Sequence, residues 1–168
     1  MSNFPKLQPA FTILVEIDAP VSIGSVSKNN SLSVVPMTGG TIKSEPGFSP
    51  ALDSKFVGTG NDYIRNDVDR KRMRLDAHGV VKTDDGAGIY LHYTGVAEAT
   101  EEITAALTGS VENITTSFGN TFTHITFETG SEAYKGLEDG VFVATGRFIR
   151  EKGKPIVVEY KVSQVVQG

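Results

Sequence analysis

The chain has 168 residues, 21% of which are charged, and its formal net charge is −4. It contains no cysteine, which excludes disulfide bonds, thiolate catalysis and cysteine-bound metal centres. The negative charge and the lack of a dense Lys/Arg segment argue against a nucleic-acid partner. The length suits one well-buried core, so we expect residues 1–168 to form a single domain.

The N-terminal segment does not have the pattern of a targeting sequence. Its apolar run within residues 11–17 is too short to cross a membrane, and no small-residue cleavage site follows a hydrophobic region. We therefore expect a cytoplasmic protein without a membrane partner.

Alternating apolar residues predict strands in the first third of the chain. Residues 11–17 alternate between an apolar and a mixed face, and residues 32–37 form a second short apolar run. The glycines within residues 38–41 predict a turn or a bulge. Residues 43–54 lack any periodicity and are rich in Pro, Ser and Gly, which is typical of a surface loop.

The most regular stretch, residues 72–95, predicts an antiparallel hairpin around which the other strands are arranged. Both of its arms alternate, and the corner at residues 84–86 contains the Asp and Gly residues that a tight turn tolerates. One face is polar and titratable. It carries Arg72, Arg74, Asp76, His78, Tyr90, His92 and Thr94. The opposite face is mainly apolar and carries Leu75, Ile89, Leu91 and Tyr93.

The second half of the chain adds one helix and three strands. Residues 98–107 predict a short peripheral helix that ends before Gly109. Residues 121–128, 141–149 and 156–166 are predicted strands. A count of eight to ten strands predicts a closed barrel or a sandwich, and the barrel is favoured because closure removes exposed sheet edges. We expect a core of alternating apolar residues: Phe11, Ile13, Val15, Leu75, Ile89, Leu91, Phe127, Val143 and Val158.

Five motifs in this order resemble a family of small bacterial and fungal β-barrel proteins known only as a domain of unknown function. They are Gly39-Gly40, Gly60-Asn61-Asp62-Tyr63, Leu75-Asp76-Ala77 followed by residues 82–87 and Ile89-Tyr90, Phe127-Glu128-Thr129-Gly130 with Tyr134 and Leu137, and Val141-Phe142-Val143 with Gly146. The resemblance implies a lipocalin-like, closed antiparallel β-barrel that often self-associates. It implies no particular activity. In the family the second motif usually ends in Trp, where this chain has Tyr63.

Titratable residues recur on one face of two predicted strand regions, so we expect them to share one barrel cavity. The candidate catalytic residues are Asp62, Tyr90, His124 and Glu128. The candidate ligand-binding residues are Tyr63, Arg74, Asp76, His92 and Tyr134. A carboxylate beside a histidine or tyrosine in a dry pocket is an acid/base pair, which would allow isomerisation, elimination or cyclisation of a small apolar molecule without a cofactor.

Four alternatives stay open at the level of sequence. The aspartate and glutamate of the motifs could only cap backbone amides, or the protein could be a non-catalytic carrier of an apolar ligand. His78, His92 and His124 could meet around a metal, but their wide separation is no motif, so we expect no metal site. If the apolar strand faces fill the barrel, the polar set lies on its outer wall instead. The strand at residues 156–166 is apolar on both faces, which suggests that one face is covered either by another chain, in a homo-oligomer, or by the helix.

Overall fold

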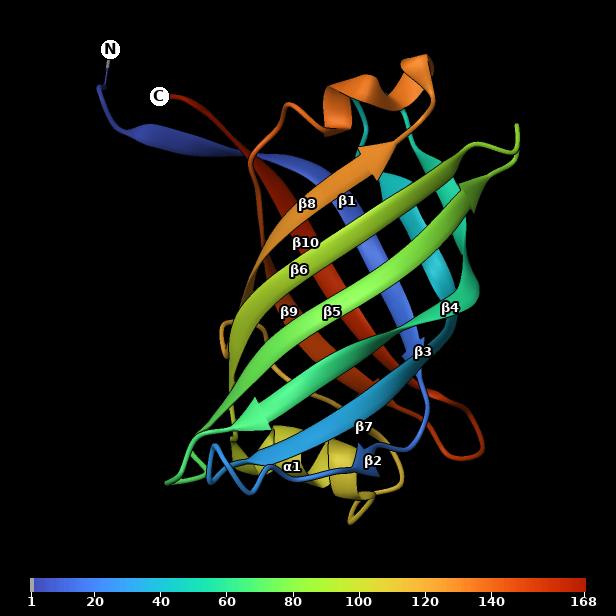
Figure 1. The fold of residues 1–168 in the computed structure, drawn as a ribbon. Helices are drawn as coiled ribbons and strands as arrows, with labels where there is room; N and C mark the ends of the chain where they lie inside the picture. The colour runs from blue at the N-terminus through green and yellow to red at the C-terminus, as the bar shows by residue number, and fades with distance from the viewer. Residues whose placement is uncertain (1) are drawn as a thin grey trace.

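The computed structural model describes residues 2–168 and shows a closed antiparallel β-barrel (Figure 1). Its elements, in chain order, are β1 (Pro5–Ile17), β2 (Val21–Ser22), β3 (Ser31–Ser44), β4 (Asp53–Asn66), β5 (Arg72–Thr83), β6 (Gly88–Glu98), α1 (Glu101–Thr108), β7 (Ile114–Thr115), β8 (Thr121–Thr129), the 3₁₀ helix η1 (Glu132–Leu137), β9 (Phe142–Arg150) and β10 (Ile156–Gln167). Eight strands follow each other around the wall in the order β1, β10, β9, β8, β6, β5, β4, β3, and pairing of β1 with β3 closes the ring. The short strands β2 and β7 lie beside β3 and β9. The expected fold class is confirmed.

The expected central hairpin is β5–β6, and its mainly apolar face points into the barrel. Its strands pair from Arg72 with Glu98 to Lys82 with Gly88. The inward residues Leu75, Ile89 and Leu91 are buried. Burial of each such side chain contributes about 1.5–3 kcal/mol relative to exposure. The hydrophobic effect therefore decides which face is inside, and the polar face of the hairpin becomes outer wall.

The Gly39-Gly40 pair lies inside β3 and forms a bulge, not a turn. The register of β3 against β4 shifts between Pro36 and Thr41. Gly40 has φ +121°, and a Cβ atom there would lie 1.9 Å from the carbonyl oxygen of Leu14, so only glycine allows β1 to pack this closely against β3.

One prediction of a core residue is wrong. Val143 is only partly buried, because its neighbours Phe142 and Ala144 take the inward positions of β9.

The end of the barrel near the two termini is filled by aromatic rings. Phe11, Phe127 and Phe142 pack together with ring centroids 5.4–5.7 Å apart. Phe48, from the loop between β3 and β4, packs on Phe11 at 4.7 Å. This loop corresponds to the predicted irregular segment, and through Phe48 it closes that end of the barrel together with the buried Leu137 of η1.

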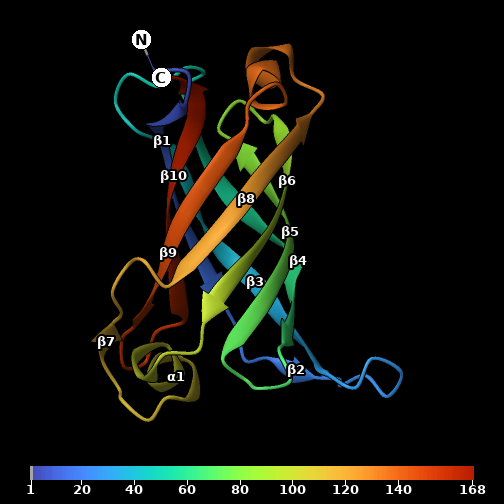
Figure 2. The same cartoon turned by 90° about the vertical axis from the view of Figure 1, so that its left-hand side faces the viewer.

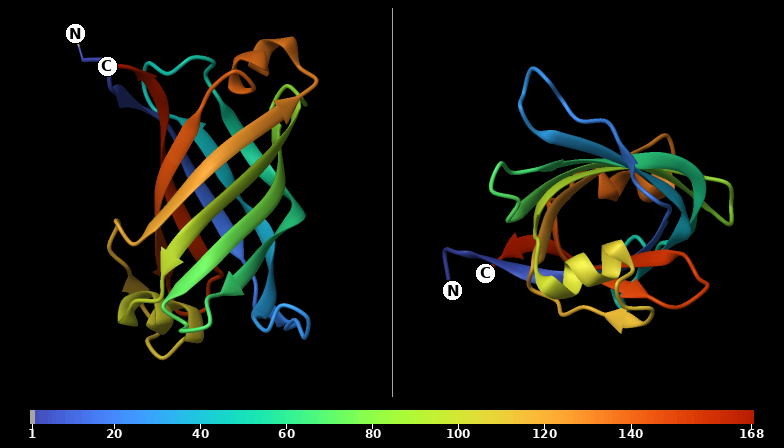
Figure 3. Two further views of the ribbon diagram at one scale, coloured as in Figure 1. Left: turned by 60° about the vertical axis from the view of Figure 1, so that its left-hand side comes forward. Right: turned by 90° about the horizontal axis from the view of Figure 1, so that it is seen from below.

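The helix α1 lies at the opposite end, partly across the barrel opening (Figure 3, right). It begins at Glu101 and not at residue 98, because Glu98 pairs with Arg72 in the sheet. The Oγ1 atom of Thr100 accepts the backbone N–H of Ile103 at 3.2 Å, and Gly109 ends the helix in the left-handed conformation. Figure 2 shows α1 below the paired strands β8, β9 and β10. Among residues 2–168, no helix has the length and apolar character needed to span a bilayer.

Candidate functional site

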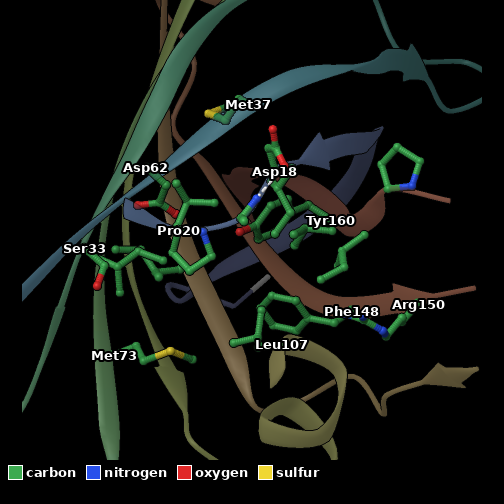
Figure 4. A pocket seen from close by; sticks show the side chains of 18 of the residues that line it. Asp18, Pro20, Ser33, Met37, Asp62, Met73, Leu107, Phe148, Arg150 and Tyr160 are labelled. Carbon is green, nitrogen blue, oxygen red and sulfur yellow. Dashed lines mark hydrogen bonds between the residues drawn. The ribbon is translucent and has the colours of Figure 1, made fainter. Parts of the chain in front are cut away.

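A cavity of about 460 Å³ occupies the half of the barrel nearest α1 (Figure 4). Its volume lies within the range of small-molecule sites. Most of its wall is apolar, and includes Met37, Ile64, Met73, Leu75, Phe148 and Val158. Leu107 of α1 lines it from the open end. Because aromatic rings fill the other end of the barrel, the cavity opens at the end where α1 and the neighbouring loops lie.

Asp62 places a carboxylate in this apolar cavity. It shares the inward face of β4 with Phe56 and Ile64, and only 7% of it is exposed. The strand reaches this position through an irregular segment, where the register of β4 against β5 shifts between Phe56 and Gly60. A Cβ atom on Gly60 would lie 2.2 Å from the carbonyl oxygen of His78, so glycine is needed for this close approach.

Burial raises the pKa of Asp62 from its ordinary value of 3.8 to about 7. The backbone N–H of Asp76 donates to Asp62 Oδ1 at 3.0 Å and opposes that rise, while the negative charge of Asp76 adds to it. Desolvation is the largest of these effects. The Asp62 carboxyl can therefore take up or release a proton near neutral pH.

Tyr93 and Tyr160 bring two further polar groups to the same cavity. They come from β6 and β10, their ring centroids lie 5.2 Å apart, and both are almost completely buried. Burial raises the pKa of both hydroxyls, and the nearby charge of Asp62 raises them further. Both tyrosines stay protonated at neutral pH and can donate hydrogen bonds to a bound molecule.

Charged side chains surround the mouth of the cavity. Asp18, Arg150 and Lys154 line it (Figure 4 labels the first two). Arg150 Nη1 donates to the carbonyl oxygen of Ala106 at 2.9 Å, which ties α1 to the end of β9. The mouth is thus polar and the interior apolar, an arrangement that suits an amphipathic organic molecule.

The structure does not bring the four expected catalytic residues together. Asp62 lies in the cavity, but Tyr90, His124 and Glu128 lie on the outer wall, because the buried residues Leu91, Ile125 and Phe127 take the inward positions of their strands. Tyr90 and Glu128 are opposite each other in the β6–β8 pair and border a shallow depression on the outside. The expected common cavity of these residues is therefore wrong.

The expected ligand-binding residues lie outside the cavity as well. Tyr63, Arg74, Asp76 and His92 point outward from the wall formed by β4, β5 and β6. Arg74 makes a two-pronged ion pair with Asp67, at 2.9 and 2.7 Å, across the β4–β5 turn. Tyr134 lies on η1, at the closed end.

Sequence reasoning missed Tyr93 and Tyr160, although a signal was present. Tyr93 alternates in phase with Ile89 and Leu91, and Tyr160 with Val158 and Val162. A single tyrosine on an otherwise apolar strand face indicates that its hydroxyl group lies inside the barrel. The same rule finds Asp62, which alternates in phase with Phe56 and Ile64.

Comparison with known proteins places this architecture in a family. The family model described as "Protein of unknown function (DUF3237)" matches residues 5–165. The UPF0311 protein of Clostridium acetobutylicum is 25% identical over 157 residues, which cover 93% of each chain.

Two solved structures show the same fold. A conserved protein of unknown function from Rhodopseudomonas palustris superimposes with a TM-score of 0.74 at 22% identity, covering 99% of this chain and 100% of the other. A structure described as an enzyme from Penicillium herquei gives a TM-score of 0.62 at 20% identity, covering 98% and 97%. With the family model matching nearly its whole length, the chain belongs to the family of proteins of unknown function DUF3237.

Proposed function

We propose that this protein binds a small, largely apolar organic molecule inside the barrel and catalyses a proton transfer on it without a cofactor. The observation that carries the proposal is the buried Asp62 carboxylate facing an apolar cavity that also holds the hydroxyls of Tyr93 and Tyr160. The reaction class is isomerisation, elimination or cyclisation, since each of these needs only a base, a hydrogen-bond donor and a shaped cavity.

The roles of the three side chains follow from their chemistry. The Asp62 carboxylate accepts a proton from a carbon or hydroxyl of the ligand. Tyr93 and Tyr160 donate hydrogen bonds to the ligand oxygen on which negative charge develops. Return of the proton to another atom completes an isomerisation. In a cyclisation the deprotonated oxygen adds to an electron-poor C=C bond of the same molecule, the π bond breaks, and Asp62 returns its proton to the resulting carbanion. Loss of a leaving group gives elimination.

The surroundings support this assignment. A buried carboxylate costs free energy, and such groups concentrate at functional sites. The apolar wall strengthens electrostatic interactions with any bound oxyanion, because water is largely excluded. The P. herquei protein, which shares this fold, is described as an enzyme.

Hydrogen–deuterium exchange at carbon tests proton transfer without knowledge of the natural substrate. The protein is incubated in D₂O with a panel of apolar monocyclic and bicyclic ketones, and NMR follows deuterium incorporation beside the carbonyl. We expect the wild type to accelerate exchange for the ketones that bind. Asp62→Asn should slow this exchange by at least about 100-fold while the ketone still binds. Tyr93→Phe and Tyr160→Phe should each slow it by roughly tenfold or more.

Glu128→Gln is the matched control, because it removes an exposed carboxylate from the outer wall and should leave exchange unchanged. A wild type that binds ketones but exchanges them no faster than Asp62→Asn would contradict catalysis. That result would favour the alternative function, a carrier for a small apolar ligand.

A further inference from the structure

The outer wall of the barrel carries a second cluster of chemically active side chains. Asp76 and His78 belong to β5, and His92 lies directly opposite His78 on β6. Each of the three offers one ligand atom, and these atoms all lie within 4.8 Å of one another. Since inward and outward residues alternate along a strand, this cluster lies on the opposite face of the wall from the cavity.

The three side chains converge on one point. Asp76 Oδ1 lies 2.7 Å from His92 Nε2 and 3.2 Å from His78 Nε2. The two imidazole rings stack with centroids 4.2 Å apart and an angle of 12° between their planes. Two imidazole nitrogens and one carboxylate oxygen therefore already occupy a space the size of a metal coordination shell.

A neighbouring tyrosine orients one of the imidazoles. The Tyr90 hydroxyl lies 2.7 Å from His78 Nδ1. In the tautomer whose Nδ1–H donates to this hydroxyl, Nε2 is unprotonated and can bind an ion that lies between it and Asp76. Metal-binding histidines commonly use their second nitrogen in this way, which fixes both the tautomer and the ring orientation.

We propose that Asp76, His78 and His92 bind one divalent transition-metal ion such as Zn²⁺. Bonds of about 2.0–2.1 Å in a tetrahedral shell hold ligand atoms roughly 3.3 Å apart. The present separations of 2.7 and 3.2 Å from Asp76 Oδ1 need only a small adjustment to reach that value. Two imidazoles with one carboxylate match zinc, copper and nickel, whereas magnesium and calcium prefer oxygen ligands alone.

The ring stacking has to open for both Nε2 lone pairs to reach the same ion. All three side chains are 34–52% exposed, so the rings can rotate on their solvent-facing side. His78 also contacts the rings of Tyr63 and Tyr90, at centroid distances of 6.0 and 6.1 Å. The backbone positions are fixed by the paired β5 and β6 strands, which keep the ligands together before the ion binds. The remaining coordination positions face solvent and would hold water.

Isothermal titration of the untagged protein with ZnCl₂ alone tests the site. We expect the wild type to bind one equivalent. His78→Ala, His92→Ala and Asp76→Asn should each weaken binding at least about tenfold, because each removes or alters a ligand. Tyr90→Phe keeps all three ligands and should weaken binding by up to roughly tenfold, since it loses only the orienting contact.

His124→Ala is the matched control. His124 is the remaining one of the three histidines in the chain and projects from the outer face of β8, but it is not a member of the cluster. Its removal should leave zinc binding unchanged, and circular dichroism checks the fold of each variant. A wild-type dissociation constant weaker than about 1 mM, or equal binding by the double variant His78→Ala/His92→Ala, would overturn the proposal. Loss of binding in His124→Ala would do so as well.

Discussion

Asp62 lies in an environment unlike the one that an aspartate ordinarily prefers. An aspartate on the surface keeps its charge and its water, whereas Asp62 has exchanged nearly all its water for an apolar cavity and one backbone N–H donor from Asp76. Burial therefore shifts the proton equilibrium of Asp62 toward the protonated form relative to an aspartate in water, and Tyr93 and Tyr160 line the same cavity as neutral hydroxyls. Asn at this position would fill a similar volume and could still accept the Asp76 N–H, without a charge to desolvate.

This environment predicts a pH-dependent stability. The folded pKa of Asp62, about 7, lies above its ordinary value of 3.8, so its contribution to stability is complete below pH 3.8 and is lost as pH rises through 7. Relative to the wild type, Asp62→Asn should therefore gain up to about 4 kcal/mol in free energy of unfolding between pH about 4 and about 8. Urea denaturation across this pH range measures it. A difference that stays constant with pH would contradict the assignment, and Glu128→Gln controls for loss of one carboxylate.

At the scale of elements, the helix α1 packs against the barrel and lies at the mouth of the cavity. Ile103 and Ala106 pack into the core, Leu107 lines the cavity, and Arg150 holds the carbonyl oxygen of Ala106. The helix has only two turns, so its own hydrogen bonds contribute little, and its order depends on these contacts and on its caps. Substitutions at the ends of α1 should therefore alter the structure of the cavity mouth.

The N-cap provides a direct measure of this dependence. Thr100→Ala removes the hydroxyl that accepts the Ile103 N–H, which should cost about 1 kcal/mol and lower the melting temperature by roughly 2–4 °C. Amide hydrogen exchange should accelerate in residues 101–108 and stay unchanged in the barrel strands. Thr108→Ala is the control, since this exposed hydroxyl bonds only within the helix. Equal effects of the two substitutions would mean that the cap does not hold α1 in place.

The whole molecule is a barrel with one filled end, one open end and two different wall faces. Phe11, Phe48, Phe127 and Phe142 fill the end near the termini, so a ligand has to pass α1 to reach Asp62. The outer face of β5 and β6 carries the proposed metal site, separated from the cavity by the thickness of one sheet. The homo-oligomer expected from the apolar residues of β10 stays a prediction.

Leu107→Trp tests the direction of ligand access. The larger side chain should narrow the mouth and slow association of an apolar fluorescent probe, such as an anilinonaphthalene sulfonate, by roughly tenfold in stopped-flow measurements. Tyr134→Phe, at the filled end, should leave the association rate unchanged. The opposite pattern would place the access route at the end of η1.

The sequence by itself determined most strands of the barrel, the β5–β6 hairpin and the helix α1 with its Gly109 end, because period-two alternation and turn residues are local properties of the chain; it did not predict β4, whose glycines interrupt the alternation. The sequence also identified Asp62 as a candidate site residue, because Asp62 belongs to one of the motifs that carry the family resemblance. Only the tertiary structure decided which strand face is inside. Burial of the apolar faces through Ile89, Leu91 and Phe127 sent Tyr90, His124 and Glu128 outward and brought Tyr93 and Tyr160 to Asp62 from distant strands. His78 and His92 face each other in the β5–β6 hairpin, a contact that the predicted corner at residues 84–86 already indicated.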